Sequence, residues 1–333
     1  VPPAVRREAL ARFGVAEKIA AIRRALESFG VRYDVWFSEE ELYRRGAVAR
    51  VVKELTARGA TYEYEGALWF KARDYGADKD EVLIRSTGAP TYFAADVAYH
   101  LNKLERGFGW LINVWGADHH GHVPRLKAAL KALGIDPDCL EVVLMQLVRL
   151  FRGGEPVRMS KRSGDFVTLE ELLEEVGRDA ARYFFVLRSA DSHLDFDLDL
   201  ARAQSMENPV YYVQYAHARI ASIFRQLAAK GIPVPDASQV DLGLLTAEEE
   251  ERLMKHLAAF PEEVVDAALG LAPHRLTGYV YNLAGLFHSF YNLHRVIGAG
   301  PGLEEARIVL VQAVGIVLRQ GLRLLGVRAP ERM

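Results

Sequence analysis

A short segment in the middle of the chain concentrates positive charge, hydroxyl groups and glycine. Residues 156–165 read Pro-Val-Arg-Met-Ser-Lys-Arg-Ser-Gly-Asp, and a Gly-Gly pair comes just before them. Lys161 offers a compact ammonium group, and Arg158 and Arg162 offer guanidinium groups that can fork onto phosphate oxygens. The glycines allow such a loop to close over a nucleotide and reopen. The segment is a candidate polyphosphate-binding loop, although its composition also fits an exposed basic turn between two helices.

A carboxylate on an apolar helix is the second candidate. Thr91 is a predicted N-cap for a helix over residues 92–104, on which Tyr92 and Asp96 lie four residues apart and share one face. Asp96 has alanine and valine as its neighbours in the chain. A carboxylate in apolar surroundings requires a partner, and a guanidinium is the best bidentate one. A structural arginine elsewhere in this Arg-rich chain would satisfy that requirement.

A histidine-rich loop after a predicted strand is the third candidate. The run 110–115 is typical of a buried strand, Gly-Ala-Asp-His-His-Gly-His follows it, and residues 123–133 are predicted to be helical. Parallel α/β sheets bind ligands at such junctions, where the helix N-terminus favours anions. Asp118 could accept hydrogen bonds from ribose hydroxyls. The histidines could instead bind a metal, but no distant Cys or Glu-x-x-His pattern supports this, and we expect no protein-bound metal.

Composition bounds the class of protein. The chain has 333 residues, half of them hydrophobic and 26% charged, with a formal net charge of −2. This length accommodates two domains, and any basic surface must be a local patch. The single cysteine, Cys139, excludes an internal disulfide and favours a reducing compartment. Nothing at the start resembles a signal peptide, and the longest apolar run, 308–318, is shorter than the roughly 20 residues of a membrane span. We therefore expect a cytoplasmic protein without a membrane segment.

The local patterns also predict secondary structure outside the candidate sites. They predict helix over residues 4–29 ending at Gly30, a strand over 31–37, and one hairpin formed by 62–73 and 81–85. Asn208 and Pro209 are typical of the N-cap and first position of a helix, and helices dominate from there to the end of the chain.

The three candidate segments together resemble arginyl-tRNA synthetases, which are class I aminoacyl-tRNA synthetases. Residues 158–162, Arg-Met-Ser-Lys-Arg, are similar to the Lys-Met-Ser-Lys-Ser signature loop, with Arg at the first and last positions. Residues 86–100 resemble the family segment whose Tyr and Asp bind the side chain of the substrate arginine. Residues 116–121 resemble the Gly-Ala-Asp-His-His-Gly loop that contacts ATP.

The resemblance implies a role for each matching residue. Those that would act in catalysis are Lys161, Ser160 and Arg162, with Lys161 stabilising charge on the departing pyrophosphate. Those that would bind ATP are Gly116, Asp118, His119, Met159 and Arg158. Those that would bind arginine are Tyr92, Asp96 and His120.

The C-terminal helices resemble the anticodon-binding domain of the same family. Residues 210–230 interleave aromatic and basic side chains, which can stack on nucleic-acid bases, although packing between helices must account for some of them. The resemblance rests on residues 208–219 and 329–333, and it implies tRNA binding by Tyr211, Tyr215 and Arg219.

The expected fold class is α/β, with a partial class I synthetase Rossmann-like catalytic domain followed by an all-α anticodon-binding helix bundle. Residues 1–165 would be the C-terminal part of the catalytic domain with its insertion, 166–205 a connecting helical region near the tRNA stem, and 206–333 the bundle. The His-Ile-Gly-His signature of the first half is absent. His119-His120-Gly121-His122 has a similar form, but it lies too close to the Met-Ser-Lys loop to be that signature.

The resemblance implies an arginine-tRNA ligase, which forms arginyl-adenylate from ATP and L-arginine and then esterifies tRNA-Arg, with Mg²⁺ accompanying ATP. Because the signature is missing, we expect this chain to be an incomplete polypeptide that cannot catalyse adenylation alone. We also expect it to be a monomer. The alternative is a non-catalytic tRNA-binding module derived from a class I synthetase. A class I synthetase for another amino acid is disfavoured by Tyr92 and Asp96.

Overall fold

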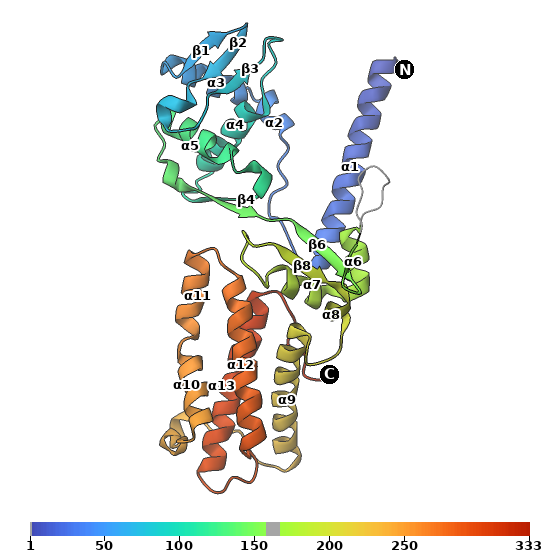
Figure 1. The fold of residues 1–333 in the computed structure, drawn as a ribbon, viewed down its shortest axis with the longest axis vertical. Helices are drawn as coiled ribbons and strands as arrows, with labels where there is room; N and C mark the ends of the chain where they lie inside the picture. Colours follow the sequence, from blue (N-terminus) through green and yellow to red (C-terminus); the bar gives the residue numbers. More distant parts are fainter. Residues whose placement is uncertain (1, 158–166) are drawn as a thin grey trace. The chain divides into compact units, whose positions relative to one another are not determined.

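The computed structural model describes residues 2–157 and 167–333 (Figure 1). The chain forms two compact units. The central unit is Tyr33–Leu147, and the terminal unit combines Val1–Arg32 with Val148–Met333. Each unit has its own apolar core. Within the described residues, every helix is too short or too polar to span a bilayer.

The central unit contains two small sheets and the helices that cover them. Its elements, in chain order, are α2 (Glu40–Arg44), α3 (Ala47–Ala57), β1 (Thr61–Tyr64), β2 (Ala67–Phe70), the 3₁₀ helix η1 (Ala72–Tyr75), β3 (Glu81–Ile84), α4 (Tyr92–Glu105), β4 (Leu111–Gly116), η2 (Ala117–His119), α5 (His122–Ala132), η3 (Pro137–Cys139) and β5 (Leu140–Met145). Strands β1, β2 and β3 form an antiparallel meander, and β4 pairs with β5 in parallel.

Helix α4 lies at the centre of this unit. It packs against α2, α3, α5 and β3. Phe93 and Val97 are fully buried on α4, as are Leu55 on α3 and Leu126 on α5. Each such side chain contributes about 1.5–3 kcal/mol of burial free energy. The apolar side of α4 therefore fixes the helix within the unit.

The start of α4 is fixed by Thr91, which is the N-cap predicted from the sequence. Its Oγ1 accepts a hydrogen bond from the Ala94 amide and donates one to the Val82 carbonyl over 2.7 Å. The cap thus joins the first turn of α4 to β3. This contact sets the position of the residues on that first turn.

The terminal unit combines a short sheet with a helical bundle. Its elements are α1 (Pro3–Phe29), β6 (Val148–Arg152), β7 (Glu155–Pro156), α6 (Leu169–Val176), α7 (Arg178–Phe185), β8 (Leu194–Asp197), α8 (Leu198–Arg202), α9 (Pro209–Ala229), η4 (Ala237–Gln239), η5 (Leu242–Leu244), α10 (Glu248–Ala258), α11 (Phe260–Leu269), α12 (His274–Leu293) and α13 (Leu303–Leu324). Strand β6 is antiparallel to β7 and parallel to β8.

Helix α12 is the central helix of the bundle. It packs against α9, α10, α11 and α13, and Figure 1 shows these helices running alongside one another. Leu283 and Phe287 of α12 are fully buried, together with Val213 of α9 and Val314 of α13. The bundle begins as predicted: the Asn208 side chain accepts from the Val210 amide, and Pro209 occupies the first turn of α9.

Two of the secondary-structure predictions are wrong. Residues 31–37 form no strand, and Phe37 instead stacks on Tyr99 of α4 at 4.5 Å between ring centroids. Their aromatic content reflects packing rather than strand pairing. The segment 62–73 is not one strand of a hairpin, because it folds back on itself at Glu65-Gly66. Both residues have positive φ, as a type I′ turn requires, and β3 adds a third strand.

Candidate functional site

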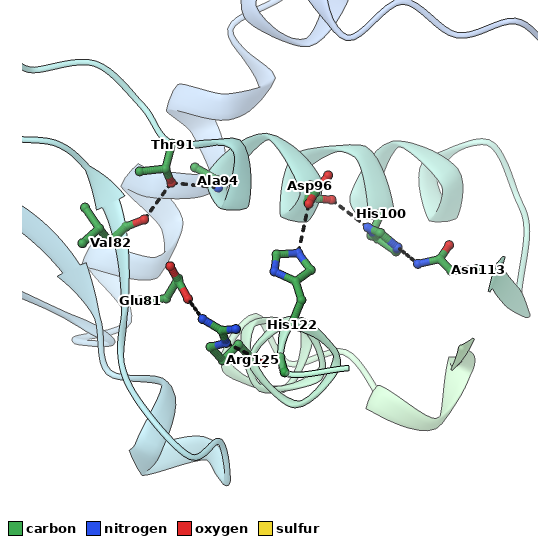
Figure 2. Close-up of polar contacts among 10 residues, drawn as sticks. Glu81, Val82, Thr91, Ala94, Asp96, His100, Asn113, His122 and Arg125 are labelled. Carbon is green, nitrogen blue, oxygen red and sulfur yellow. Dashed lines mark hydrogen bonds and ion pairs between the residues drawn. The ribbon is translucent and has the colours of Figure 1, made fainter. Parts of the chain in front are cut away.

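The Asp96 carboxylate is held by a histidine from a neighbouring helix. His122, the first residue of α5, places Nε2 3.0 Å from Asp96 Oδ2, as Figure 2 shows. The His122 side chain is 8% exposed, whereas that of Asp96 is 39% exposed. Because a carboxylate only accepts, His122 Nε2–H is the donor. Asp96 therefore keeps access to solvent on one side while its orientation is fixed from the other.

Aromatic rings surround His122. The Tyr92 ring stacks on it at 5.7 Å between centroids, Phe93 meets it edge-on at 5.5 Å, and Trp115 of β4 lies 5.4 Å away. Tyr92 itself is 61% exposed. Tyr92 and Asp96 are therefore brought together, both open to solvent and both in contact with the same buried imidazole.

A second histidine fixes the backbone at Asp96. His100 Nδ1 donates to the Asp96 carbonyl over 2.7 Å, so Nε2 of the neutral ring accepts from Asn113 Nδ2, also at 2.7 Å (Figure 2). Asn113 Oδ1 then accepts from Lys103 Nζ at 3.0 Å. Burial lowers the pKa of His100, and the nearby Lys103 ammonium lowers it further. This chain of hydrogen bonds ties α4 to β4.

The histidine-rich loop lies at the carboxyl end of the parallel β4–β5 pair. Gly116 ends β4 opposite Met145 of β5, and η2 follows directly. Asp118 and His119 are exposed, with Oδ2 and Nε2 3.8 Å apart. The carboxyl edge of a parallel sheet is where α/β folds bind ligands. Asp118 and His119 can therefore reach a ligand in solvent at this edge.

Space at the loop is limited by Asp118. A Cβ atom at residue 116 would meet Asp118 Oδ1 at 2.5 Å, so a larger side chain there would displace the carboxylate. His120 is exposed and its Nδ1 lies 3.2 Å from the Ala117 carbonyl. No contact joins His120 to Asp96 or Tyr92 within the described residues.

The signature loop falls outside the described residues. The predicted catalytic residues Ser160, Lys161 and Arg162 lie there, as do Arg158 and Met159. Their assignments remain sequence predictions.

His122 is the site residue that sequence reasoning missed. It belongs to the histidine-rich run, but nothing in the spacing of α4 and α5 indicates that its ring reaches Asp96, 26 residues earlier. Its position as the first residue of a helix after a glycine was the available local signal.

The described residues contain no group of three or more His, Cys, Asp or Glu side chains placed to hold a metal ion.

The predicted tRNA-binding residues form a stacked array on α9. The rings of Tyr211 and Tyr215 are parallel within 7° at 6.3 Å between centroids. The Arg219 guanidinium lies over Tyr215 at 4.9 Å and over Tyr291 of α12 at 5.0 Å, and it donates to the Tyr215 hydroxyl. All three predicted residues are partly exposed.

A pocket of about 430 Å³ adjoins this array. Its lining includes Tyr215, Arg219, Arg225, Tyr291 and Arg332. The last residues of the chain reach it because they are anchored along α9. The carbonyl of Pro330 lies 2.9 Å from Nδ1 of His217, and that of Glu331 accepts from Arg225. Three arginines and two tyrosines thus line one cavity, together with Glu331 and the C-terminal Met333.

Comparisons with known proteins show that two family models match most of the chain. Residues 14–197 match the family described as tRNA synthetases class I (R), catalytic domain. Residues 213–333 match the DALR anticodon binding domain.

Several relatives cover nearly the whole chain. It is 66% identical over 332 residues to the arginine–tRNA ligase of Desulforudis audaxviator, and 63% identical to that of Moorella thermoacetica. In both cases the alignment spans 99% of this chain and 59% of the relative. A structure assigned to an arginyl-tRNA synthetase from Campylobacter jejuni superposes with a TM-score of 0.89 at 35% identity, covering 98% of this chain and 70% of that one. The Thermus thermophilus arginyl-tRNA synthetase gives 0.80 at 26% identity, covering 99% and 66%.

A catalytic-domain match over more than half of the chain, followed by a helical anticodon-binding domain, defines a class I aminoacyl-tRNA synthetase. The chain belongs to the arginyl-tRNA synthetase family within that class. The predicted fold class, a Rossmann-like catalytic domain followed by a helical bundle, is confirmed. The chain spans about 59% of the length of these curated relatives.

Proposed function

We propose that this chain contributes to the arginine-tRNA ligase reaction and that its central unit binds the side chain of the substrate L-arginine. The observation that carries the proposal is the Asp96 carboxylate, which is open to solvent on one side and fixed by His122 on the other. A carboxylate of defined orientation is the natural bidentate partner of a guanidinium group. Tyr92 lies beside it with an exposed ring that can cover the planar cation.

ATP would bind at the carboxyl edge of the β4–β5 pair. Gly116, Asp118 and His119 lie there, and an exposed carboxylate can accept from ribose hydroxyls. From the sequence, Arg158, Met159 and Lys161 would approach the phosphates, with Ser160 and Arg162 beside them. Mg²⁺ would accompany the ATP phosphates, as is usual for nucleotide substrates. His120 is proposed to contact arginine on the strength of the family resemblance.

The pocket on α9 is the proposed contact for tRNA-Arg. Its tyrosine rings offer stacking surfaces, and its guanidinium groups favour phosphate. This supports assigning Tyr211, Tyr215 and Arg219 to tRNA binding. We also propose the functional division into residues 1–165, 166–205 and 206–333, a monomeric state and a cytoplasmic location, where both tRNA and ATP are present.

An arginine titration tests this function. The 333-residue chain would be titrated with L-arginine and with citrulline, which replaces the guanidinium with a neutral ureido group, while the aromatic signals of Tyr92 are followed by NMR. We expect Tyr92 to respond to arginine at about tenfold lower concentration than to citrulline, since charge-assisted bonds are stronger. Equal responses to the two ligands, or no response to either, would contradict the proposed function.

Adenylation is a separate question. Since the sequence has no His-Ile-Gly-His signature, we expect no arginine-dependent pyrophosphate exchange by this chain, even with tRNA added. Appreciable turnover would contradict that expectation. The alternative function, a tRNA-binding module without catalysis, is favoured by the fact that the pocket on α9 is formed within the terminal unit. It predicts tRNA binding together with no response to arginine.

A further inference from the structure

One buried side chain contacts both of the residues assigned to the arginine site. His122 donates to the Asp96 carboxylate and carries the stacked Tyr92 ring on its face. Tyr92 is exposed and Asp96 is partly exposed, whereas His122 is buried. A ligand that touches Tyr92 and Asp96 would therefore meet surfaces that His122 supports from beneath.

His122 is itself held rigidly. Phe93 from α4 and Trp115 from β4 pack against its ring at 5.5 and 5.4 Å between centroids. As the first residue of α5 it has little freedom to move independently of the helix. Side chains locked by packing in this way can hold a binding group within the tolerance that recognition requires.

The hydrogen bond to His122 restricts the Asp96 carboxylate to one rotation. It occupies one site on Oδ2, and within the described residues no other side chain donates to this carboxylate. Oδ1 and the second lone pair of Oδ2 remain for a ligand. A guanidinium needs two coplanar acceptors, so a fixed carboxylate plane favours it over a cation without that geometry.

The backbone of Asp96 is held by a second histidine. Its carbonyl accepts from His100, which Asn113 secures in turn (Figure 2). Asp96 thus has its main chain fixed through β4 and its side chain fixed through α5. Without such contacts, the terminal torsion angle of an Asp side chain has a broad distribution.

We propose that His122 is a positioning residue of the guanidinium site. Its Nε2–H sets the plane of the Asp96 carboxylate, while its ring packs against the Tyr92 ring. The inference rests on the proposed function, because it concerns the same site. A purely structural role, in which His122 only joins α4 to α5, would predict a loss of stability with no change in ligand preference.

Three substitutions separate the hydrogen bond from the ring. His122→Gln keeps a hydrogen-bond donor at similar reach but removes the aromatic ring. His122→Met has nearly the shape of the Gln side chain but no donor. His122→Phe keeps the aromatic face alone. The affinities for L-arginine, citrulline and L-lysine would be measured by NMR titration, with the midpoint of thermal unfolding recorded for each variant.

We expect His122→Met and His122→Phe to lower the preference for arginine over lysine by about tenfold, which is the scale of one hydrogen bond to a charged group. His122→Gln should keep that preference within about threefold. The Gln and Met pair is matched in size, so it decides the matter even where the Phe variant does not fold. Equal preference in the folded Gln and Met variants overturns the positioning role.

The outcomes also distinguish this inference from the proposed function. Where the unsubstituted chain shows no preference for arginine, the arginine site fails and the positioning role fails with it. Where that preference is present but insensitive to His122→Met, only the positioning role is lost. Loss in the Met variant with retention in the Gln variant supports both.

Discussion

Asn113 on β4 donates its side-chain amide to Nε2 of His100 on α4 over 2.7 Å, and both side chains are buried. Because the Asn113 amide nitrogen can only donate, Nε2 of His100 must be unprotonated to accept. The proton of the neutral ring is then on Nδ1, which donates to the Asp96 carbonyl. Protonation of His100 would set two donors against each other. The scaffold of the proposed arginine site therefore depends on a neutral histidine.

Stability should fall in mild acid. Burial and Lys103 lower the pKa of His100 below the ordinary value of about 6.5 that it regains on unfolding. Below that ordinary value the unfolded chain binds a proton at this histidine that the folded chain does not bind. The free energy of unfolding therefore decreases by up to about 1.4 kcal/mol for each unit by which the pH falls. The contribution of His100 to the free energy of unfolding should be constant above about pH 6.5. It should decrease as the pH falls from there toward the pKa of the folded state.

Urea unfolding at a series of pH values measures this decline. Burial also lowers the pKa of His288 in the terminal unit, which adds a second contribution of the same sign. His100→Gln removes one of them and should flatten the profile of the central unit, at a cost of about 1 kcal/mol at neutral pH. An identical pH profile in the variant would show that His100 does not titrate as described.

Two glycines in the bundle should respond to alanine in opposite directions. A Cβ on Gly321 of α13 would clash with the Val280 side chain of α12, while one on the exposed Gly278 meets nothing within 4 Å. Gly321→Ala should therefore destabilise the protein by about 1–3 kcal/mol. Gly278→Ala should stabilise it by about 0.5–1 kcal/mol through helix propensity. Denaturant midpoints test this, and a stable Gly321→Ala variant would contradict the packing of α12 on α13.

Arg219 should contribute to tRNA affinity in a salt-dependent way. Arg219→Gln removes one cation from the pocket, so the affinity for a tRNA-Arg transcript should fall about tenfold and the salt slope should decrease by about one. Arg252→Gln is the matched control, because Arg252 is an exposed cation on α10 of the same unit. Fluorescence anisotropy at several salt concentrations gives both quantities. Equal effects of the two substitutions would assign binding to general charge rather than to the pocket.

Local signals in the sequence predicted the starts of helices well. Thr91 and Asn208 both cap helices as their residue types indicate, since the relevant hydrogen bonds join neighbours in the chain. Strand partners were harder to predict. The run around residues 31–37 has strand-like composition, yet Phe37 packs on α4 and no strand forms. Strand formation depends on a distant partner, which composition does not reveal.

The same limit applies to the site. The spacing of four residues places Tyr92 and Asp96 on one helical face, and the resemblance of residues 86–100 to the family segment assigns them to the arginine site. His122 was not identified in this way, because its contact with Asp96 arises from the packing of α5 against α4. The burial of its ring between α5 and its partners on α4 becomes apparent only when both helices are placed. Contacts within one helix can be predicted from spacing, and contacts between helices require the fold.

The account depends most on Asp96 as the partner of the substrate guanidinium. The direct measurement is the arginine affinity of the unsubstituted chain, of Asp96→Asn and of Glu105→Gln, which removes an exposed carboxylate from the far end of the same helix. We predict that Asp96→Asn weakens arginine binding by about 10–100-fold, since a hydrogen bond to a charged group contributes about 1.5–3 kcal/mol. Glu105→Gln should leave it unchanged. An Asp96→Asn variant that binds arginine as well as the unsubstituted chain would contradict the arginine site.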